Sequence, residues 1–126
     1  MKYKYEYFIN RELSWLEFND RVLNEAVYEE NPLLEKCKYL SITSSNLDEF
    51  FMTRIGALKA QIDSNFTGKD ISGMTPKQQM EKTEERIEKL IKKQYTIYNN
   101  EIIPDLKKND IHILKYGELS KTEKEI

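Results

Sequence analysis

The chain has 126 residues, enough for one domain with a modest hydrophobic core but not for two. Charged residues make up 33% of the chain and hydrophobic residues 39%, with only four Gly and three Pro, a mixture typical of helical proteins. The net charge of −2 argues against nucleic-acid binding, and the single cysteine cannot form an internal disulfide. The sequence has no apolar run long enough to span a membrane, so we expect a cytoplasmic protein.

The first predicted helix runs from about Glu12 to Tyr28, with the side chain of Asn10 as its N-terminal cap. At about 100° per residue, its apolar side chains cover more than half of the helix circumference. An arc this wide predicts a core helix that packs against two neighbours. Its members are Leu13, Trp15, Leu16, Phe18, Val22, Leu23, Ala26 and Val27.

Two further helices are expected next, joined by a short corner. Asn31 is the predicted cap of a helix over residues 32–42, in which proline takes the first position, where no N–H is needed. Residues 44–46, Ser-Ser-Asn, then interrupt the pattern, and a third helix is expected over residues 47–63. The corner would leave backbone N–H groups and the side chain of Asn46 exposed.

A fourth, long helix begins after Thr75, which stands at capping-box spacing from Gln78. Its apolar residues form one narrow stripe, so it is expected to pack on one side only. Pro104 should kink or restart this helix, because proline lacks a backbone N–H, and the helix should finish at residues 107–109.

The last part of the chain carries weaker signals. Residues 111–114, Ile-His-Ile-Leu, alternate weakly and predict a short strand or extended segment. Ser120 and Glu123 stand at capping-box spacing, so a further helix is expected to begin there. Only Ile126 follows as an apolar residue, which predicts a truncated helix without its buried face.

The expected fold class is therefore all-α. We predict an antiparallel bundle of about four helices, with a short extended segment and a truncated helix at the C-terminus. Residues 1–108 are assigned to this helical domain, and residues 109–126 to the truncated start of a second domain.

The sequence offers no set of residues that would support catalysis. It has one histidine, no Gly-rich phosphate loop and no Cys/His cluster with metal-ligand spacing. A structural role is favoured for His112, which lies in the predicted extended segment, and inert packing for Cys37. We assign no catalytic residue and no metal ligand within these 126 residues.

Three polar residues, Asn19, Arg54 and Asn46, break the pattern of the predicted helices. Asn19 falls within the arc of the first helix, where a buried amide needs hydrogen-bond partners. Arg54 falls among apolar residues of the third helix, with no carboxylate one turn away to neutralise it. An interhelical ion pair between Asp20 and Arg54, with Asn19 bonded to backbone, is the favoured interpretation. The alternative is that Arg54 meets a ligand.

Asn46 has two interpretations. From its position in the predicted corner, it is a helix cap. Alternatively, its amide offers a donor and an acceptor together and matches the edge of a purine.

Three blocks of sequence, in order and spanning about residues 8–62, resemble the opening of polyphosphate kinase. They are FINRELSWLEFN (8–19) with RVLNEA (21–26), NPLLEK (31–36) with YLSI (39–42), and SSNLDEFFM (44–52) with Arg54 and residues 58–59. Residues 63–108 fit the variable helix of that family, and residues 111–126 the start of its second domain.

The resemblance implies an enzyme that transfers the terminal phosphate of ATP reversibly onto inorganic polyphosphate, through a phosphohistidine and with Mg²⁺. This chain would be the first of four domains, covering the adenine of ATP with Asn46, and Arg54, Asn19 and Asp20 are candidate supporting residues. The metal site, the phosphate-binding arginines and the catalytic histidines of the family lie beyond Ile126, so His112 matches none of them.

The resemblance also implies ATP, ADP and polyphosphate as partners, together with the remaining domains of the same chain. The full enzyme is expected to be a homo-oligomer, cytoplasmic or peripheral to the membrane, and the fragment alone to be inactive. The rival hypothesis is a helical protein–protein interaction module that binds no nucleotide.

Overall fold

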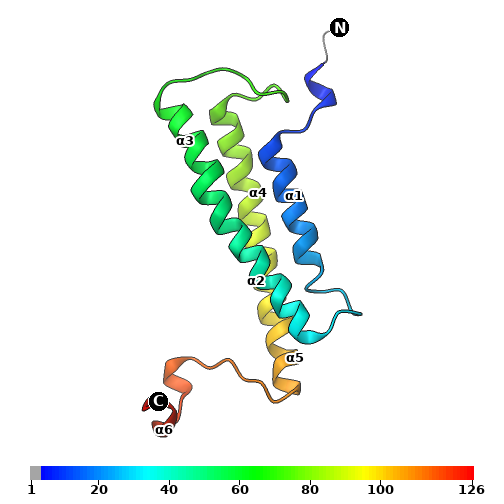
Figure 1. Cartoon of the computed structure of the whole chain (residues 1–126), viewed down its shortest axis with the longest axis vertical. Helices are drawn as coiled ribbons and strands as arrows, with labels where there is room; N and C mark the ends of the chain where they lie inside the picture. Colours follow the sequence, from blue (N-terminus) through cyan, green and yellow to red (C-terminus); the bar gives the residue numbers. More distant parts are fainter. Residues whose placement is uncertain (1–3) are drawn as a thin grey trace.

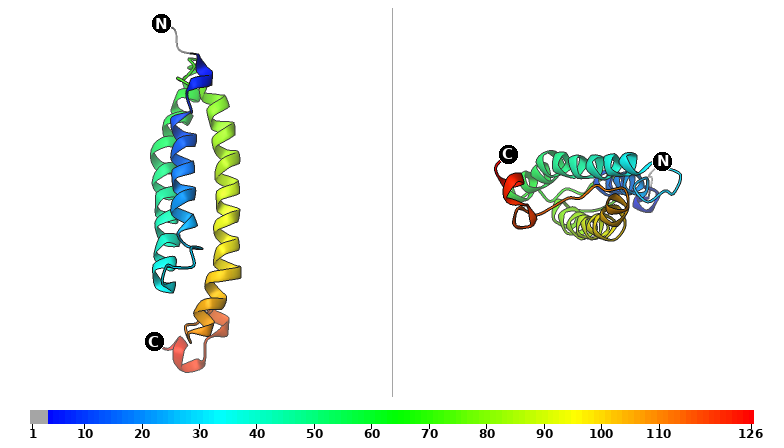
Figure 2. Two further views of the ribbon diagram at one scale, coloured as in Figure 1. Left: turned by 90° about the vertical axis from the view of Figure 1, so that its right-hand side faces the viewer. Right: turned by 90° about the horizontal axis from the view of Figure 1, so that it is seen from below.

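The protein folds into long antiparallel helical rods that lie side by side (Figures 1 and 2). The computed structural model describes residues 4–126. Helix α1 (Arg11–Asn24) runs in one direction, and α2 (Leu33–Phe50), the π-helical turn η2 (Phe51–Ile55) and α3 (Gly56–Asp63) run back as one continuous rod. Helix α4 (Pro76–Ile97) returns beside them, packed against α1 and α3. The predicted all-α, antiparallel bundle is confirmed.

A second π-helical turn, η3 (Tyr98–Ile102), separates α4 from α5 (Ile103–Lys108). Pro104 lies in the first turn of α5, directly after this wider turn. Because proline cannot donate to the carbonyl one turn earlier, the regular hydrogen-bond pattern must change here. The predicted restart of the helix at Pro104 is confirmed.

The C-terminal part lies away from the rods (Figure 1). Residues 111–115 have no regular secondary structure, and no strand occurs within residues 4–126, so the expected strand is not formed. The short helices η4 (Tyr116–Glu118) and α6 (Lys121–Lys124) follow, and another 3-10 turn, η1 (Tyr5–Tyr7), precedes α1. The proposed domain boundary at residue 108 coincides with the end of α5 and remains a prediction. Residues 1–3 of the proposed first domain lie outside the described part of the chain.

Three of the predicted N-terminal caps, Asn10, Thr75 and Ser120, are confirmed. Oδ1 of Asn10 accepts a hydrogen bond from the backbone N–H of Leu13 at 3.0 Å. Thr75 and Gln78 form a reciprocal capping box at the start of α4, and Ser120 and Glu123 form another at the start of α6. Each cap depends on residues within one turn, which is why the sequence alone could locate it.

The end of α1 and the start of α2 differ from the prediction. Helix α1 ends at Asn24, although Ala26 remains buried beyond it, because the tight turn that follows still directs apolar side chains inward. The side chain of Asn31 caps nothing in α2, and instead donates to the backbone oxygen of Glu25 at 2.8 Å. Asn31 therefore fastens the connection after α1, and Pro32 takes the cap position.

The core lies along the line where the rods meet. Its buried apolar side chains come from α1 and the turn after it, and from α2, α4, η3 and α5, so residues distant in sequence hold the bundle together through hydrophobic burial. They are Leu16, Leu23, Ala26, Leu47, Phe50, Ile87, Leu90, Ile97, Ile102 and Leu106. Within residues 4–126, none of the helices combines the length and apolar character that crossing a bilayer requires.

Candidate functional site

Asn46 lies in the middle of α2 and not at a corner between helices. The helix is unbroken because the buried side chains of Thr43, Leu47 and Phe50 repeat at helical spacing across the Ser-Ser-Asn sequence. This stripe packs on the neighbouring rods, and tertiary packing outweighs the weak helix preference of serine and asparagine. The predicted corner, and the role of Asn46 as a helix cap, are therefore wrong.

The side chain of Asn46 is held by Asn19 of α1. Nδ2 of Asn46 donates to Oδ1 of Asn19 at 3.1 Å, and Nδ2 of Asn19 donates to the main-chain oxygen of Thr43 at 3.3 Å. Asn19 is completely buried, and its predicted hydrogen bond to backbone is confirmed. Within the described residues, no other hydrogen bond involves the side chain of Asn46. Its amide oxygen and second N–H are therefore available to a ligand.

Asn46 opens onto a cleft of about 420 Å³ between α1 and the rod formed by α2, η2 and α3. The ring of Trp15 from α1 stacks on that of Phe50 from α2, with centroids 4.8 Å apart and an angle of 18° between their planes. The cleft therefore combines an aromatic wall with a few polar groups. Its lining consists of Trp15, Phe18, Asn46, Glu49, Phe50, Thr53, Arg54 and Ala57.

Arg54 lines this cleft but pairs with Glu12, not with Asp20. Its Nη1 lies 4.0 Å from Oε1 of Glu12, whose side chain is only 8% exposed. Asp20 instead faces α4, where Arg86 and Lys93 donate hydrogen bonds to its carboxylate. The predicted Asp20–Arg54 ion pair is therefore wrong, because the two side chains face different neighbours. Asp20 also lies outside the lining of the cleft, so nothing supports a direct role for it there.

Charged side chains join α1 to α4 on the side away from the cleft. Arg86 contacts Glu17 and Asp20 at 2.6 Å each, and its hydrogen bond is the main cause that lowers the pKa of Glu17. Burial raises the pKa of Asp20, but hydrogen bonds from Lys93 and Arg86 outweigh burial and hold this pKa below its ordinary value. The hydrogen bond to Glu17 likewise raises the pKa of Arg86. These groups stay charged near neutral pH and fix the orientation of α1.

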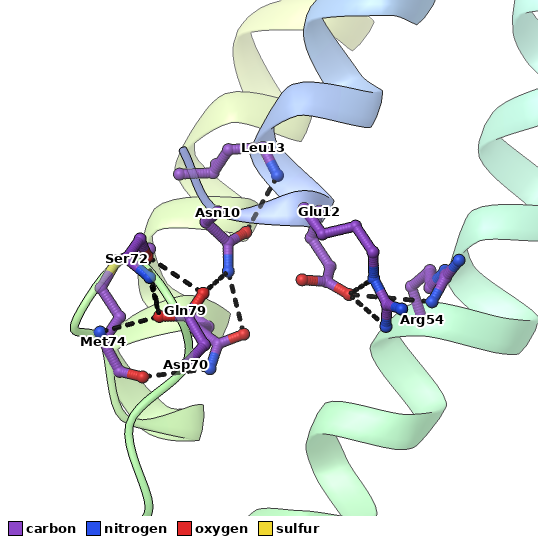
Figure 3. A network of polar contacts seen from close by, with 9 residues as sticks. Asn10, Glu12, Leu13, Arg54, Asp70, Ser72, Met74 and Gln79 are labelled. Atoms are coloured by element: carbon purple, nitrogen blue, oxygen red, sulfur yellow. Dashed lines mark hydrogen bonds and ion pairs between the residues drawn. The ribbon is translucent and has the colours of Figure 1, made fainter. Parts of the chain in front are cut away.

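A polar network fastens the start of α1 to the loop between α3 and α4 (Figure 3). Nδ2 of Asn10 donates to Asp70 at 2.7 Å and to Gln79 at 3.0 Å. Burial raises the pKa of Asp70, but hydrogen bonds from the Met74 backbone, Ser72 and Asn10 outweigh it and lower the pKa. The network holds the turn of α1 from which Glu12 faces Arg54 (Figure 3).

Sequence reasoning missed Glu12 and Trp15 as parts of the site. Both lie on the first turns of α1, at positions −7 and −4 from Asn19, and therefore on nearly the same helical face. This helical spacing from Asn19 is the feature of the sequence that could have indicated that both residues belong to the site. Phe50 is buried against Trp15, whereas the side chain of Phe51 is 43% exposed and lies outside the cleft.

A second, largely apolar groove of about 500 Å³ lies between α2 and α4. It contains none of the candidate site residues. Nor do residues 4–126 bring together three or more His, Cys, Asp or Glu side chains that could hold a metal ion.

Comparison with known proteins identifies the family. Residues 8–114 match the profile described as the polyphosphate kinase N-terminal domain. The chain belongs to the polyphosphate kinase family. A polyphosphate kinase from Halalkalibacterium halodurans is 50% identical over 115 residues, which cover 90% of this chain and 16% of that protein. One from Exiguobacterium is 45% identical over 125 residues, covering 98% of this chain and 17% of that protein.

A polyphosphate kinase from Lactiplantibacillus plantarum is 41% identical over 121 residues, covering 96% of this chain and 17% of its own length. The chain thus spans about a sixth of the length of these relatives. The family match extends beyond residue 62, where the three matching blocks end, and includes α4, α5 and residues 111–114.

Proposed function

We propose that this chain forms the adenine side of the ATP site in a polyphosphate kinase. In the complete enzyme, the terminal phosphate of ATP is transferred reversibly onto inorganic polyphosphate. Asn46 contacts the adenine, and Asn19 holds Asn46 in position. Parts of the enzyme outside these 126 residues bind the terminal phosphates and carry out the transfer.

The observation that carries this proposal is the free edge of the Asn46 amide beside an aromatic wall. An adenine presents an N–H donor next to a ring-nitrogen acceptor, and an asparagine amide matches this pair with two hydrogen bonds. Asn46 has one carbonyl oxygen and one N–H without another partner in the described residues. Trp15, whose half-buried ring stacks on the buried ring of Phe50, gives the cleft an apolar surface of the kind that a purine needs.

Mg²⁺ finds no complete set of protein ligands within residues 4–126. The ion prefers several oxygen ligands in octahedral geometry, and these residues bring together no group of three or more carboxylates. We therefore assign no residue of this chain to the metal. ATP and its partner polymer would meet the metal elsewhere in the enzyme.

The proposal can be tested in a full-length chimera, in which residues 1–126 replace the matching residues of the Halalkalibacterium halodurans relative. In this chimera, Asn46→Ala should raise the KM for ATP about tenfold, a loss of ~1.4 kcal/mol, and change kcat little. The reason is that the adenine lies far from the phosphate that is transferred, so its contacts are equal in the ground state and the transition state.

Thermal unfolding of the same variant controls for loss of structure, and Asn99→Ala, an exposed asparagine without a described partner, serves as the matched control. The 126-residue chain alone should show no polymer growth from ATP. An unchanged KM for ATP in the folded Asn46→Ala chimera would contradict the adenine role and favour a helical interaction module without nucleotide.

A further inference from the structure

Arg54 lies between two hollows of the surface. One is the cleft that contains Asn46, and the other is a hollow of about 350 Å³ between the start of α1, α3 and the loop before α4. Arg54 and Ala57 line both. The Arg54 side chain is 40% exposed, so its guanidinium is accessible from solvent.

The guanidinium of Arg54 is only weakly engaged by the protein. Within residues 4–126, the one ion pair of the Arg54 side chain is the 4.0 Å contact to Glu12, and this side chain forms no hydrogen bond. Arg86 is different, because it contacts both Glu17 and Asp20 at 2.6 Å and its side chain is 21% exposed. Arg86 therefore has the contacts of a structural arginine, whereas Arg54 keeps most of its five N–H donors free.

The π-helical turn η2 brings Arg54 onto the same face of the rod as Asn46. In a regular α-helix, eight residues would rotate a side chain about 80° past two full turns. A π-helical turn accommodates one extra residue, so the eight residues from Asn46 to Arg54 cover close to two turns. Both side chains consequently reach the same cleft, about 11–12 Å apart along the helix axis.

The order of polar residues along this face follows the order of groups in a nucleotide. Asn46 offers an amide for the base, and Glu49, one turn later in the lining, offers a carboxylate that can accept hydrogen bonds from ribose hydroxyls. Arg54, at the far end, offers the planar fork that matches the oxygens of a phosphate.

We propose that Arg54 binds the phosphate nearest the ribose of the nucleotide whose adenine contacts Asn46. This inference rests on the proposed function and extends it to a second nucleotide-binding residue. Glu12 holds the guanidinium at the rim of the cleft, and its 4.0 Å separation leaves the N–H donors free to turn toward the phosphate. Figure 3 shows the carboxylate of Glu12 directed at Arg54 from the first turn of α1.

The test compares the binding of AMP and adenosine, two ligands that differ by this one phosphate, to the full-length chimera by titration calorimetry. Arg54→Gln should weaken AMP binding about tenfold and leave adenosine binding within about twofold of the parent. Arg54→Lys should recover only part of the AMP affinity, because lysine keeps the charge but lacks the fork. Lys59→Gln, an exposed cation of α3 outside the cleft, is the charge-matched control and should change neither ligand.

The two proposals fail in distinguishable ways. Asn46→Ala should weaken AMP and adenosine equally, and if it weakens neither ligand, the adenine site itself is refuted. If Asn46→Ala weakens both ligands but Arg54→Gln weakens neither, or weakens both equally, the phosphate role of Arg54 is refuted. Thermal unfolding of each variant shows whether the protein is folded, and Arg54→Lys provides the comparison if the glutamine variant is not.

Discussion

At the scale of single residues, the buried amide of Asn19 determines how Asn46 is presented to the cleft. Asn19 accepts from Asn46 at 3.1 Å and donates to the backbone of α2 at 3.3 Å. A buried amide with both ends engaged is oriented uniquely, because a flipped amide would place donor against donor. We therefore propose Asn19 as a positioning residue for Asn46, whose outer edge forms no hydrogen bond within the described residues.

We predict that Asn19→Ala lowers the free energy of unfolding by about 1–3 kcal/mol, because Asn46 loses its partner and a small cavity forms. The same variant should raise the KM for ATP of the full-length chimera, since Asn46 is then free to rotate away from the ligand. Urea unfolding of the 126-residue chain measures the first effect, and steady-state kinetics below the unfolding temperature measure the second. A destabilised variant with an unchanged KM would show that Asn19 is structural only.

At the scale of secondary structure elements, the charged contacts between α1 and α4 set the rotation of α1 about its axis. Glu17 and Asp20 face Arg86 and Lys93, and this leaves the opposite face of α1, with Trp15 and Asn19, to α2 and the cleft. The pKa values of Glu17 and Asp20 are both lowered. The folded state therefore favours the charged carboxylates more strongly than the unfolded state does.

This linkage predicts loss of stability in acid. A carboxylate with a lowered pKa contributes stability above its unfolded pKa, about 4, and the contribution is lost as the pH falls through the folded pKa. The free energy of unfolding should thus decrease between about pH 5 and pH 3, and Asp20→Asn should make the decrease shallower. Denaturant unfolding across this pH range provides the measurement. Asp63→Asn, in an exposed position at the end of α3, should behave like the parent, and equal slopes for Asp20→Asn and the parent would contradict the account.

At this scale, the sequence predicted contacts between residues close together in the chain but not contacts between different helices. The caps at Asn10, Thr75 and Ser120 involve neighbours within one turn, and all were predicted. The ion-pair partner of Arg54 depends on how the helical rods are rotated about their axes, and no local sequence pattern determines that rotation. The predicted partner was Asp20, whereas the structure pairs Arg54 with Glu12. The unbroken α2 results from a buried stripe that outweighs a polar Ser-Ser-Asn sequence. The adenine contact of Asn46 was predicted from the chemistry of its amide and from the family resemblance, and the structure adds the cleft beside it.

At the scale of the whole molecule, this chain corresponds to about a sixth of its relatives. The cleft has walls from α1 on one side and from α2, η2 and α3 on the other, and it is open to solvent. A cleft that is open to solvent in this way suits a binding site shared between domains, in which this domain contacts the base and other domains contact the terminal phosphates. The division also agrees with the chemistry, since phosphoryl transfer needs metal ions and cationic side chains around the phosphates.

The most direct measurement is a crystal structure of the full-length chimera with a non-hydrolysable ATP analogue. We expect the adenine to lie in the cleft between α1 and α2, with its edge within hydrogen-bond distance of the Asn46 amide and the Asn19–Asn46 hydrogen bond intact. An analogue bound with its adenine away from α1 and α2, and with the edge of Asn46 still facing solvent, would contradict the account.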